Sequence, residues 1–211
     1  MDSRKKDPIN NILYGKEYEY ELLIYEGGYK NGIKNGKGKE YYGNGKIKFE
    51  GEYKNGIKWN GKMYDFNNNE IIYELKEGEG IIKEYNYNGN LIFEGQYLNG
   101  KRNGQGKEYN CYYFEGKFEN SERNSKGKEC YPNYILKILK YEGEFKNDKR
   151  NGEGKEYDLN GNLIFKGNYL YDKKIKGKSY IEGQLEYESE YLYDKKWNGK
   201  GYDKNGNIIY E

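Results

Sequence analysis

Histidine is missing from the 211 residues of this chain, and most of the familiar side-chain chemistry is excluded with it. Histidine is the usual general base, the central member of nucleophilic triads and a common metal ligand. The two cysteines, Cys111 and Cys130, have neither a Cys-x-x-Cys spacing nor a histidine partner. We expect both to be small apolar residues on strands, in a protein without a disulfide framework.

Carboxylates and glycines are the remaining candidates for chemistry. The 35 acidic residues are closely interleaved with 37 lysines and arginines, for a net charge of +2. This pattern favours cross-strand ion pairs on a solvent-facing surface over a glycosidase-like carboxylate pair. The Gly-x-Gly pairs lack the following helix that a phosphate-binding loop needs. We therefore expect no catalytic residue, no metal, no cofactor and no enzyme activity. A nucleic-acid partner is not expected either, because the basic residues are not clustered.

An internal repeat organises the chain. Each copy reads aromatic-x-Gly-x-aromatic, then a turn, then a segment related to Gly-Lys-Glu-Tyr, at steps of 20 to 27 residues. The copies start near residues 25, 49, 73, 93, 114, 141, 165 and 187, and the copy at Tyr73 is degenerate. Leu75 and Ser189 replace the strand glycine in two copies.

The spacing within a copy predicts two strands and two turns. In the segment from Phe49 to Tyr53, the two rings and the glycine share one parity and the two glutamates share the other. Because side chains alternate along a strand, one face is predicted to carry rings and the other charge. The glycine is expected to leave room for neighbouring rings. Asn-Gly pairs such as Asn55-Gly56 and Asn160-Gly161 predict tight hairpin turns.

These strands predict an all-β fold, an elongated single-layer antiparallel β-meander of tandem hairpins that forms a solenoid-like twisted ribbon. We expect an N-terminal cap or flexible segment over residues 1–13 and the repeat array over residues 14–211.

The repeat pattern resembles the MORN (membrane occupation and recognition nexus) family from about Gly15 to Glu211. It is also similar to hairpin repeats of the YwqK antitoxin type. The MORN resemblance implies an elongated β-ribbon that scaffolds protein assemblies, often at membranes or the cytoskeleton. It also leaves open a targeting or regulatory segment of a larger enzyme. Together with the absence of an apolar leader, it predicts a cytoplasmic protein with cytoskeletal or membrane association as an option.

The aromatic stripe is the candidate binding surface. A stacking role alone would explain it, whereas incomplete cover by a single layer would leave a groove for a protein partner of unknown identity. The fourteen candidate residues are Tyr25, Tyr29, Phe49, Tyr53, Phe93, Tyr97, Phe114, Phe118, Tyr141, Phe145, Phe165, Tyr169, Tyr187 and Tyr191. Self-association through a sheet edge is a second route. Binding to acidic phospholipid is a weaker alternative, because it needs a local basic cluster.

Overall fold

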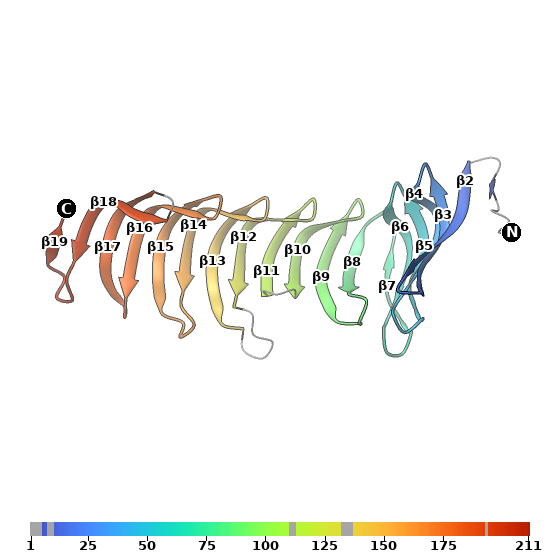
Figure 1. The fold of residues 1–211 in the computed structure, drawn as a ribbon, viewed down its shortest axis with the longest axis horizontal. Helices are drawn as coiled ribbons and strands as arrows, with labels where there is room; N and C mark the ends of the chain where they lie inside the picture. The colour runs from blue at the N-terminus through green and yellow to red at the C-terminus, as the bar shows by residue number, and fades with distance from the viewer. Residues whose placement is uncertain (1–5, 8–10, 110–112, 132–136, 193) are drawn as a thin grey trace. The chain divides into compact units, whose positions relative to one another are not determined.

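Strands and turns make up the chain over the residues that the structure, a computed structural model, describes: 6–7, 11–109, 113–131, 137–192 and 194–211. They form two sheets in which the strands follow one another in sequence order (Figure 1). The first sheet contains β1 (Lys6–Asp7), β2 (Ile12–Glu19), β3 (Leu22–Lys30), β4 (Ile33–Tyr41), β5 (Ile47–Lys54), β6 (Ile57–Tyr64) and β7 (Ile71–Leu75). The second contains β8 (Gly80–Tyr85), β9 (Leu91–Leu98), β10 (Lys101–Tyr109), β11 (Tyr113–Glu119), β12 (Glu122–Cys130), β13 (Leu139–Lys146), β14 (Lys149–Tyr157), β15 (Leu163–Leu170), β16 (Lys173–Ile181), β17 (Gln184–Leu192), β18 (Lys195–Tyr202) and β19 (Ile208–Tyr210). The predicted all-β architecture of successive antiparallel hairpins is confirmed.

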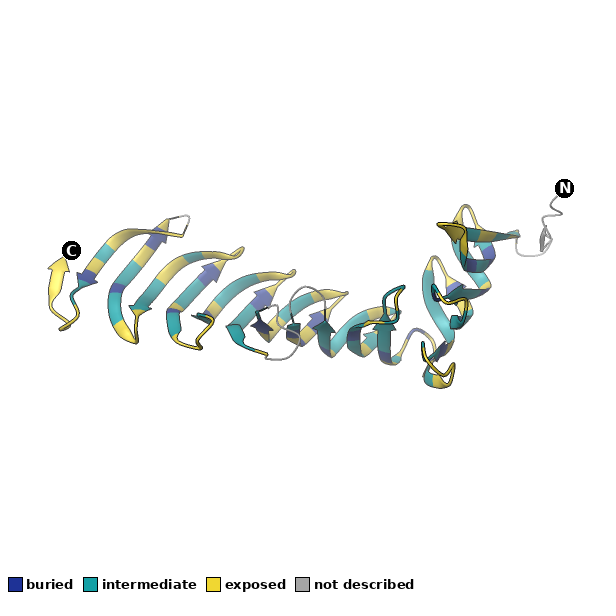
Figure 2. Ribbon diagram, turned by 60° about the horizontal axis from the view of Figure 1, so that its bottom comes forward, coloured by how far each residue is buried: buried dark blue, intermediate teal, exposed yellow. Residues whose placement is uncertain are grey.

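The predicted alternation of faces is present along the strands. In β5, Phe49 and Tyr53 are buried, while Glu50 is partly exposed and Glu52 exposed on the other face. Figure 2 shows the same arrangement along the sheets, with buried positions as short bands separated by partly or fully exposed ones.

The two kinds of Asn-Gly turn differ in geometry. At Asn55-Gly56, both residues have positive φ, 49° and 82°, as a two-residue hairpin requires. At Asn160-Gly161 only the glycine has positive φ, and the Gly161 N–H donates to the Asp158 carbonyl at 3.1 Å. The Asp158 carboxylate accepts from the Asn160 N–H at 2.9 Å. The turn at Asn55-Gly56 is therefore set by backbone freedom, and the turn at Asn160-Gly161 by the Asp158 side chain as well.

Glycine pairs hold neighbouring strands close together beneath the rings. Gly143 of β13 lies opposite Gly154 of β14. A Cβ on Gly143 would come within 2.6 Å of the Gly154 Cα, and one on Gly154 would come within 2.5 Å of the Tyr141 ring. Only hydrogen fits at either position, which confirms that the repeated glycine makes room for a ring.

The meander is interrupted between β7 and β8. These strands are joined by a tight turn and one isolated bridge, Lys76 to Glu79, and they belong to different sheets. Leu75 and Ile82 are both buried and occupy glycine positions of the repeat. Both side chains belong to one core cluster, so this part of the chain packs side chains where other copies have strand glycines.

The chain divides into two compact units, residues 1–104 and residues 105–211. The first unit contains the break between the sheets, and a core cluster that includes Tyr25, Phe49, Met63, Leu75 and Ile82 spans it. The second unit contains the tail of β10 and β11 to β19 of the second sheet.

Replacing Gly154 by alanine is expected to destabilise the second unit by about 2 kcal/mol, because the new methyl group overlaps the buried Tyr141 ring. The urea midpoint, followed by tyrosine fluorescence, measures the effect. Glu153→Ala is the matched control, since the Glu153 side chain is exposed on the other face. Equal midpoints for the two variants would contradict the packing described here.

Candidate functional site

The fourteen candidate rings, which we call the ring face, pack against one another in each unit. Twelve are buried, and Tyr29 and Tyr97 are partly buried. In the second unit, eight rings follow one another in edge-to-face contact, with centroids 5.1 to 5.4 Å apart. The first unit contains a similar series of edge-to-face contacts among the rings of Tyr29, Tyr25 and Tyr53. The predicted ring surface therefore exposes few ring atoms, and its use by a partner stays a prediction.

The tyrosine hydroxyls of the ring face are also used internally. At the first ring position, the aromatic residue that begins each copy, the Tyr141 hydroxyl donates to the Glu144 carbonyl at 3.2 Å. The Tyr187 hydroxyl likewise donates to the Glu190 carbonyl at 3.0 Å. At the second ring position of four copies, the tyrosine hydroxyl donates to a glutamate on the preceding strand, which pairs directly with the strand of the tyrosine. Tyr53, for example, donates to Glu40 at 2.8 Å.

A cation lies over the first ring of seven copies, and in six of them it pairs with a glutamate on the strand that precedes the strand of the ring. It stands nine positions after the ring in sequence: Lys34, Lys58, Arg102, Arg123, Arg150, Lys174 and Lys196. The partners of the first six are Glu17, Glu40, Glu84, Glu108, Glu129 and Glu156. The Arg150–Glu129 pair, at 2.7 Å, has both side chains only 12% exposed. Each of these rings is thus covered by an ion pair, and at Arg150 both charged side chains are largely removed from water.

Glu40 shows the electrostatics of this arrangement. Burial alone would raise its pKa, but the Lys58 ammonium at 2.7 Å and the hydrogen bonds from Lys58 and Tyr53 lower it from 4.5 to about 2. The carboxylate is therefore charged in the folded protein at all but strongly acidic pH. Burial likewise raises the pKa of Tyr53 far above its ordinary value, and the neighbouring Glu40 raises it further.

Sequence reasoning missed these cations and misplaced their glutamates. It assigned the acidic residues to the solvent-facing surface, whereas Glu40 lies on the ring face, two residues after Gly38 in β4. The parity of that spacing was a usable signal, and so was the constant step of nine residues from ring to cation.

One of these seven copies lacks the glutamate on the preceding strand. Ser179 stands where the other copies have it, and the Tyr191 hydroxyl is buried without a hydrogen-bond partner among the described residues. The cation of this copy, Lys196, pairs with Glu186 instead. A buried hydroxyl without a partner is destabilising.

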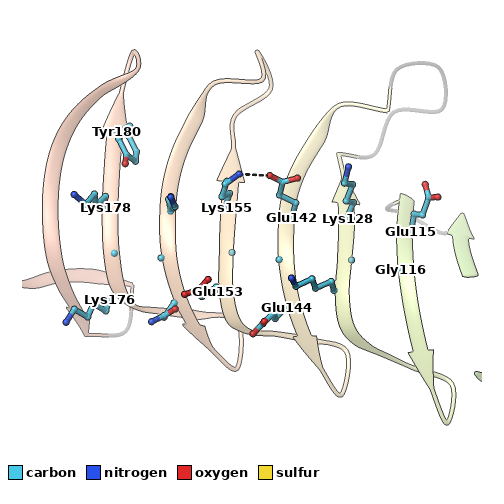
Figure 3. A pocket seen from close by; sticks show the side chains of 18 of the residues that line it. Glu115, Gly116, Lys128, Glu142, Glu144, Glu153, Lys155, Lys176, Lys178 and Tyr180 are labelled. Atoms are coloured by element: carbon cyan, nitrogen blue, oxygen red, sulfur yellow. Dashed lines mark hydrogen bonds and ion pairs between the residues drawn. The ribbon is translucent and has the colours of Figure 1, made fainter. Parts of the chain in front are cut away.

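A groove runs along the opposite face of the second unit, across β11 to β17. It has a volume of about 1070 Å³. Its floor is the backbone of the strand glycines and of Ser189: Gly116, Gly127, Gly143, Gly154, Gly167, Gly177 and Ser189. Charged side chains stand on both sides of that line, with Lys128, Glu142, Lys155 and Lys178 on one side and Glu144, Glu153 and Lys176 on the other (Figure 3). None of the fourteen ring-face residues lines it.

At the side of the groove, the carboxylate of Glu142 is bound by two donors from the neighbouring strand. The Lys155 Nζ and the Tyr157 hydroxyl both donate to Glu142 Oε1, at 3.0 and 2.8 Å. The Tyr157 hydrogen bond, followed by that of Lys155, lowers the pKa of Glu142. Burial, and then the bond to Glu142, raises the pKa of Tyr157 to about 12. These groups suit recognition of charged side chains.

The remaining sequence predictions concern the cysteines, a metal site, a membrane span and the sheet edge. Cys130 is buried as a free thiol whose pKa is raised by burial, and Cys111 lies outside the described residues. The described residues contain no group of three or more acidic or cysteine side chains placed to hold a metal ion. They also contain no helix that is long and apolar enough to span a membrane. β19, the last strand of the second sheet, has three exposed side chains, and association through this edge stays a prediction.

Glu40→Gln is expected to destabilise the first unit by about 2 kcal/mol at pH 7, because Lys58 loses its carboxylate partner. The folded-state pKa of Glu40 is depressed, so its contribution exists above pH 4.5 and is lost as the pH falls towards 2. The difference in urea midpoint between wild type and variant should therefore shrink over that interval. Glu52→Gln, at an exposed position, is the control. A difference independent of pH would refute the assignment.

Ser179→Glu is expected to stabilise the second unit by about 1 kcal/mol, because the new carboxylate can accept from the Tyr191 hydroxyl and pair with Lys196. Thermal unfolding measures the gain. The gain should fall in a Tyr191→Phe background, where the hydroxyl is absent. An equal or lower melting temperature for Ser179→Glu in the wild-type background would show that Tyr191 does not need this acceptor.

Comparison with known proteins identifies the repeat. The family model for the MORN repeat matches residues 25–47, 93–110, 114–135 and 141–163, and these segments begin at four of the repeat starts. No curated protein matches the chain. MORN repeats are known in modules that interact with proteins or membranes. The matched segments contain the ring pairs, glycines and hairpins described above, and the chain therefore contains MORN repeats at these four segments.

Proposed function

We propose that this chain is a non-enzymatic protein-interaction module whose second unit receives an extended segment of a protein partner in its groove. The observation that carries the proposal is the groove itself, an open trough with a glycine floor and charged walls across β11 to β17. Six strand steps of about 4.8 Å give it a length of roughly 30 Å, enough for about nine extended residues.

The two faces of the sheet differ in how far their side chains are engaged within the chain, and this difference supports the groove as the binding surface. The ring face is occupied by its own stacking and ion pairs, whereas Lys166 and Lys176 in the groove are exposed. Exposed charges beside a backbone floor can contact the side chains and the backbone of an extended segment.

The pairing of charges in the wall supports binding over acid–base catalysis. A general acid needs a carboxyl group whose pKa is raised towards neutrality. Glu142 has the opposite shift, because Tyr157 and Lys155 stabilise its ionised form.

Affinity capture with two charge-swapped variants tests the proposal. In the first, Glu142→Lys is combined with Lys155→Glu, which keeps an ion pair between β13 and β14 but inverts the charges presented in the groove. In the second, Lys200→Glu is combined with Glu211→Lys, which makes the same exchange at a pair outside the groove lining. Each variant is used as bait at matched concentration in an extract of the native cell.

We expect wild type and the Lys200/Glu211 swap to recover the same partner, and the Glu142/Lys155 swap to recover at least tenfold less. The expected loss follows from like charges meeting across a recognition surface. Equal recovery by all three baits, or recovery of no specific protein by the wild type at micromolar bait, would overturn the proposal.

A further inference from the structure

A row of alternating charge runs beside the strand glycines in each of the two sheets, on the face opposite the rings. In the register, Lys16 lies opposite Glu26, Glu26 opposite Lys39, and Lys39 opposite Glu50. The alternation continues in the second sheet, where Glu115 lies opposite Lys128, Lys128 opposite Glu142, and Glu142 opposite Lys155. Opposite charges on facing positions of adjacent strands stabilise the pair. We call this line of residues the charge row.

Lys166 of β15 breaks the charge row. It lies opposite Lys155 on one side and opposite Lys178 on the other, so three lysines stand side by side where the pattern calls for a central glutamate. Lys155 pairs with Glu142 at 3.0 Å and Lys178 with Glu188 at 3.0 Å. Lys166 is exposed and has no ion-pair partner among the described residues. Like charges on facing positions are destabilising, so this arrangement weakens the sheet when the groove is empty.

Because Lys166 occupies the position of a glutamate, the hydroxyl of Tyr180 in β16 also lacks a hydrogen-bond acceptor. In the preceding hairpin, Lys155 and Tyr157 of β14 together hold Glu142 of β13. Lys178 and Tyr180 occupy the corresponding positions of β16, but the residue opposite Lys178 on β15 is Lys166. The Tyr180 hydroxyl therefore has no carboxylate to bind, and the described residues provide it with no other hydrogen-bond partner.

The lining of the groove over β14 to β16 is correspondingly basic. Five charged residues line this stretch, four lysines and one glutamate: Glu153, Lys155, Lys166, Lys176 and Lys178. Lys176 is exposed and, like Lys166, has no ion pair among the described residues. Figure 3 shows Lys176 and Lys178 on the same strand on opposite sides of the glycine line, with Tyr180 beyond Lys178.

We propose that Lys166, Lys178, Lys176 and Tyr180 form a binding site for carboxylate side chains of an acidic segment of the protein partner. The inference rests on the proposed function and names the chemistry of the segment. One carboxylate of the partner takes the place of the glutamate missing from the charge row and accepts hydrogen bonds from Lys178 and Tyr180. Lys166 balances its charge, and Lys176 receives a second acidic side chain across the glycine floor.

The surroundings select a short acidic segment over a broad anionic surface. Glu142 and Glu188 stand on the two sides of the three lysines in the charge row. These glutamates repel an extended layer of negative charge such as an acidic membrane. A segment with two or three carboxylates matches the lysines alone, and uncharged residues on either side of it would pass over the glutamates.

Fluorescence anisotropy with the full chain tests the site. The probe is a labelled nine-residue peptide of alternating glutamate and glycine, and its glutamine counterpart is the control peptide. Lys166→Glu restores the alternation of the charge row, so its urea midpoint should equal or exceed that of the wild type. Its affinity for the glutamate peptide should fall about tenfold, because the site is filled by the chain's own carboxylate.

Two further variants separate this site from general electrostatic attraction. Lys204→Glu makes the same change of charge in an exposed turn of the second unit and should leave the affinity within about twofold of wild type. Tyr180→Phe keeps every charge and should weaken binding about threefold, through loss of one hydrogen bond.

Equal weakening by Lys166→Glu and Lys204→Glu would overturn the proposal, and so would equal binding of the glutamine peptide. Binding to phosphatidylserine vesicles that is lost in Lys166→Glu, with no binding of the peptide, would assign the lysines to lipid instead. Loss of the partner in the Glu142/Lys155 swap without any peptide binding would retain the interaction module and reject only the acidic segment. If only the capture experiment fails and the peptide still binds, the proposed interaction module is rejected.

Discussion

A ring that lies over a pair of facing glycines is the constraint on which the rest of the structure depends. Where Gly143 faces Gly154, the strands approach so closely that a Cβ on either would overlap backbone or the Tyr141 ring. The ring fills the space left by the missing side chains on one face. On the other face, only backbone separates the side chains on either side of each glycine, such as Glu142 and Glu144. The same residues therefore produce the buried ring face and the floor of the groove.

Ion pairs complete the ring face, because a single layer of rings leaves polar groups to satisfy. Arg150 covers Tyr141, with its guanidinium 4.3 Å from the ring centroid, and pairs with Glu129 at 2.7 Å. Removing either charged side chain would leave the other one largely buried without its ion-pair partner. The copy with Ser179 shows the result of an incomplete set, since the Tyr191 hydroxyl has no partner among the described residues. Stability in this array therefore depends on ring packing together with ion pairs that recur in seven of the copies.

Local pattern predicted much of the fold. The parity of Phe49, Gly51 and Tyr53 predicts a strand with one ring face, and Asn55-Gly56 predicts its turn, because both depend on neighbours within a few residues. The break between β7 and β8 could not be predicted in the same way. It lies where Leu75 and Ile82 replace strand glycines and enter one core cluster, and that arrangement involves contacts beyond each residue's own strand.

The groove and the charge row were harder to foresee for the same reason. The steps between repeats are uneven, and register shifts such as the one between Gly143 and Phe145 change which residues face each other. Lys166 looks ordinary in the sequence, and its anomaly emerges only opposite Lys155 and Lys178. The rings were identified correctly as a recurring stripe. Their burial follows from stacking between copies, as between Tyr141 and Tyr169, whose centroids are 5.2 Å apart.

Spectrophotometric titration of the tyrosines tests the central claim most directly, because it reports the burial of the phenol rings themselves. Burial raises the pKa of Tyr25, Tyr53, Tyr141 and Tyr169 well above the ordinary value near 10. The account predicts that ionisation of these four buried phenols, followed by absorbance at 295 nm, is delayed well above pH 10 and appears only as the protein unfolds in strong alkali. A single phase near pH 10 for all tyrosines, with the sheets still folded by circular dichroism, would contradict it.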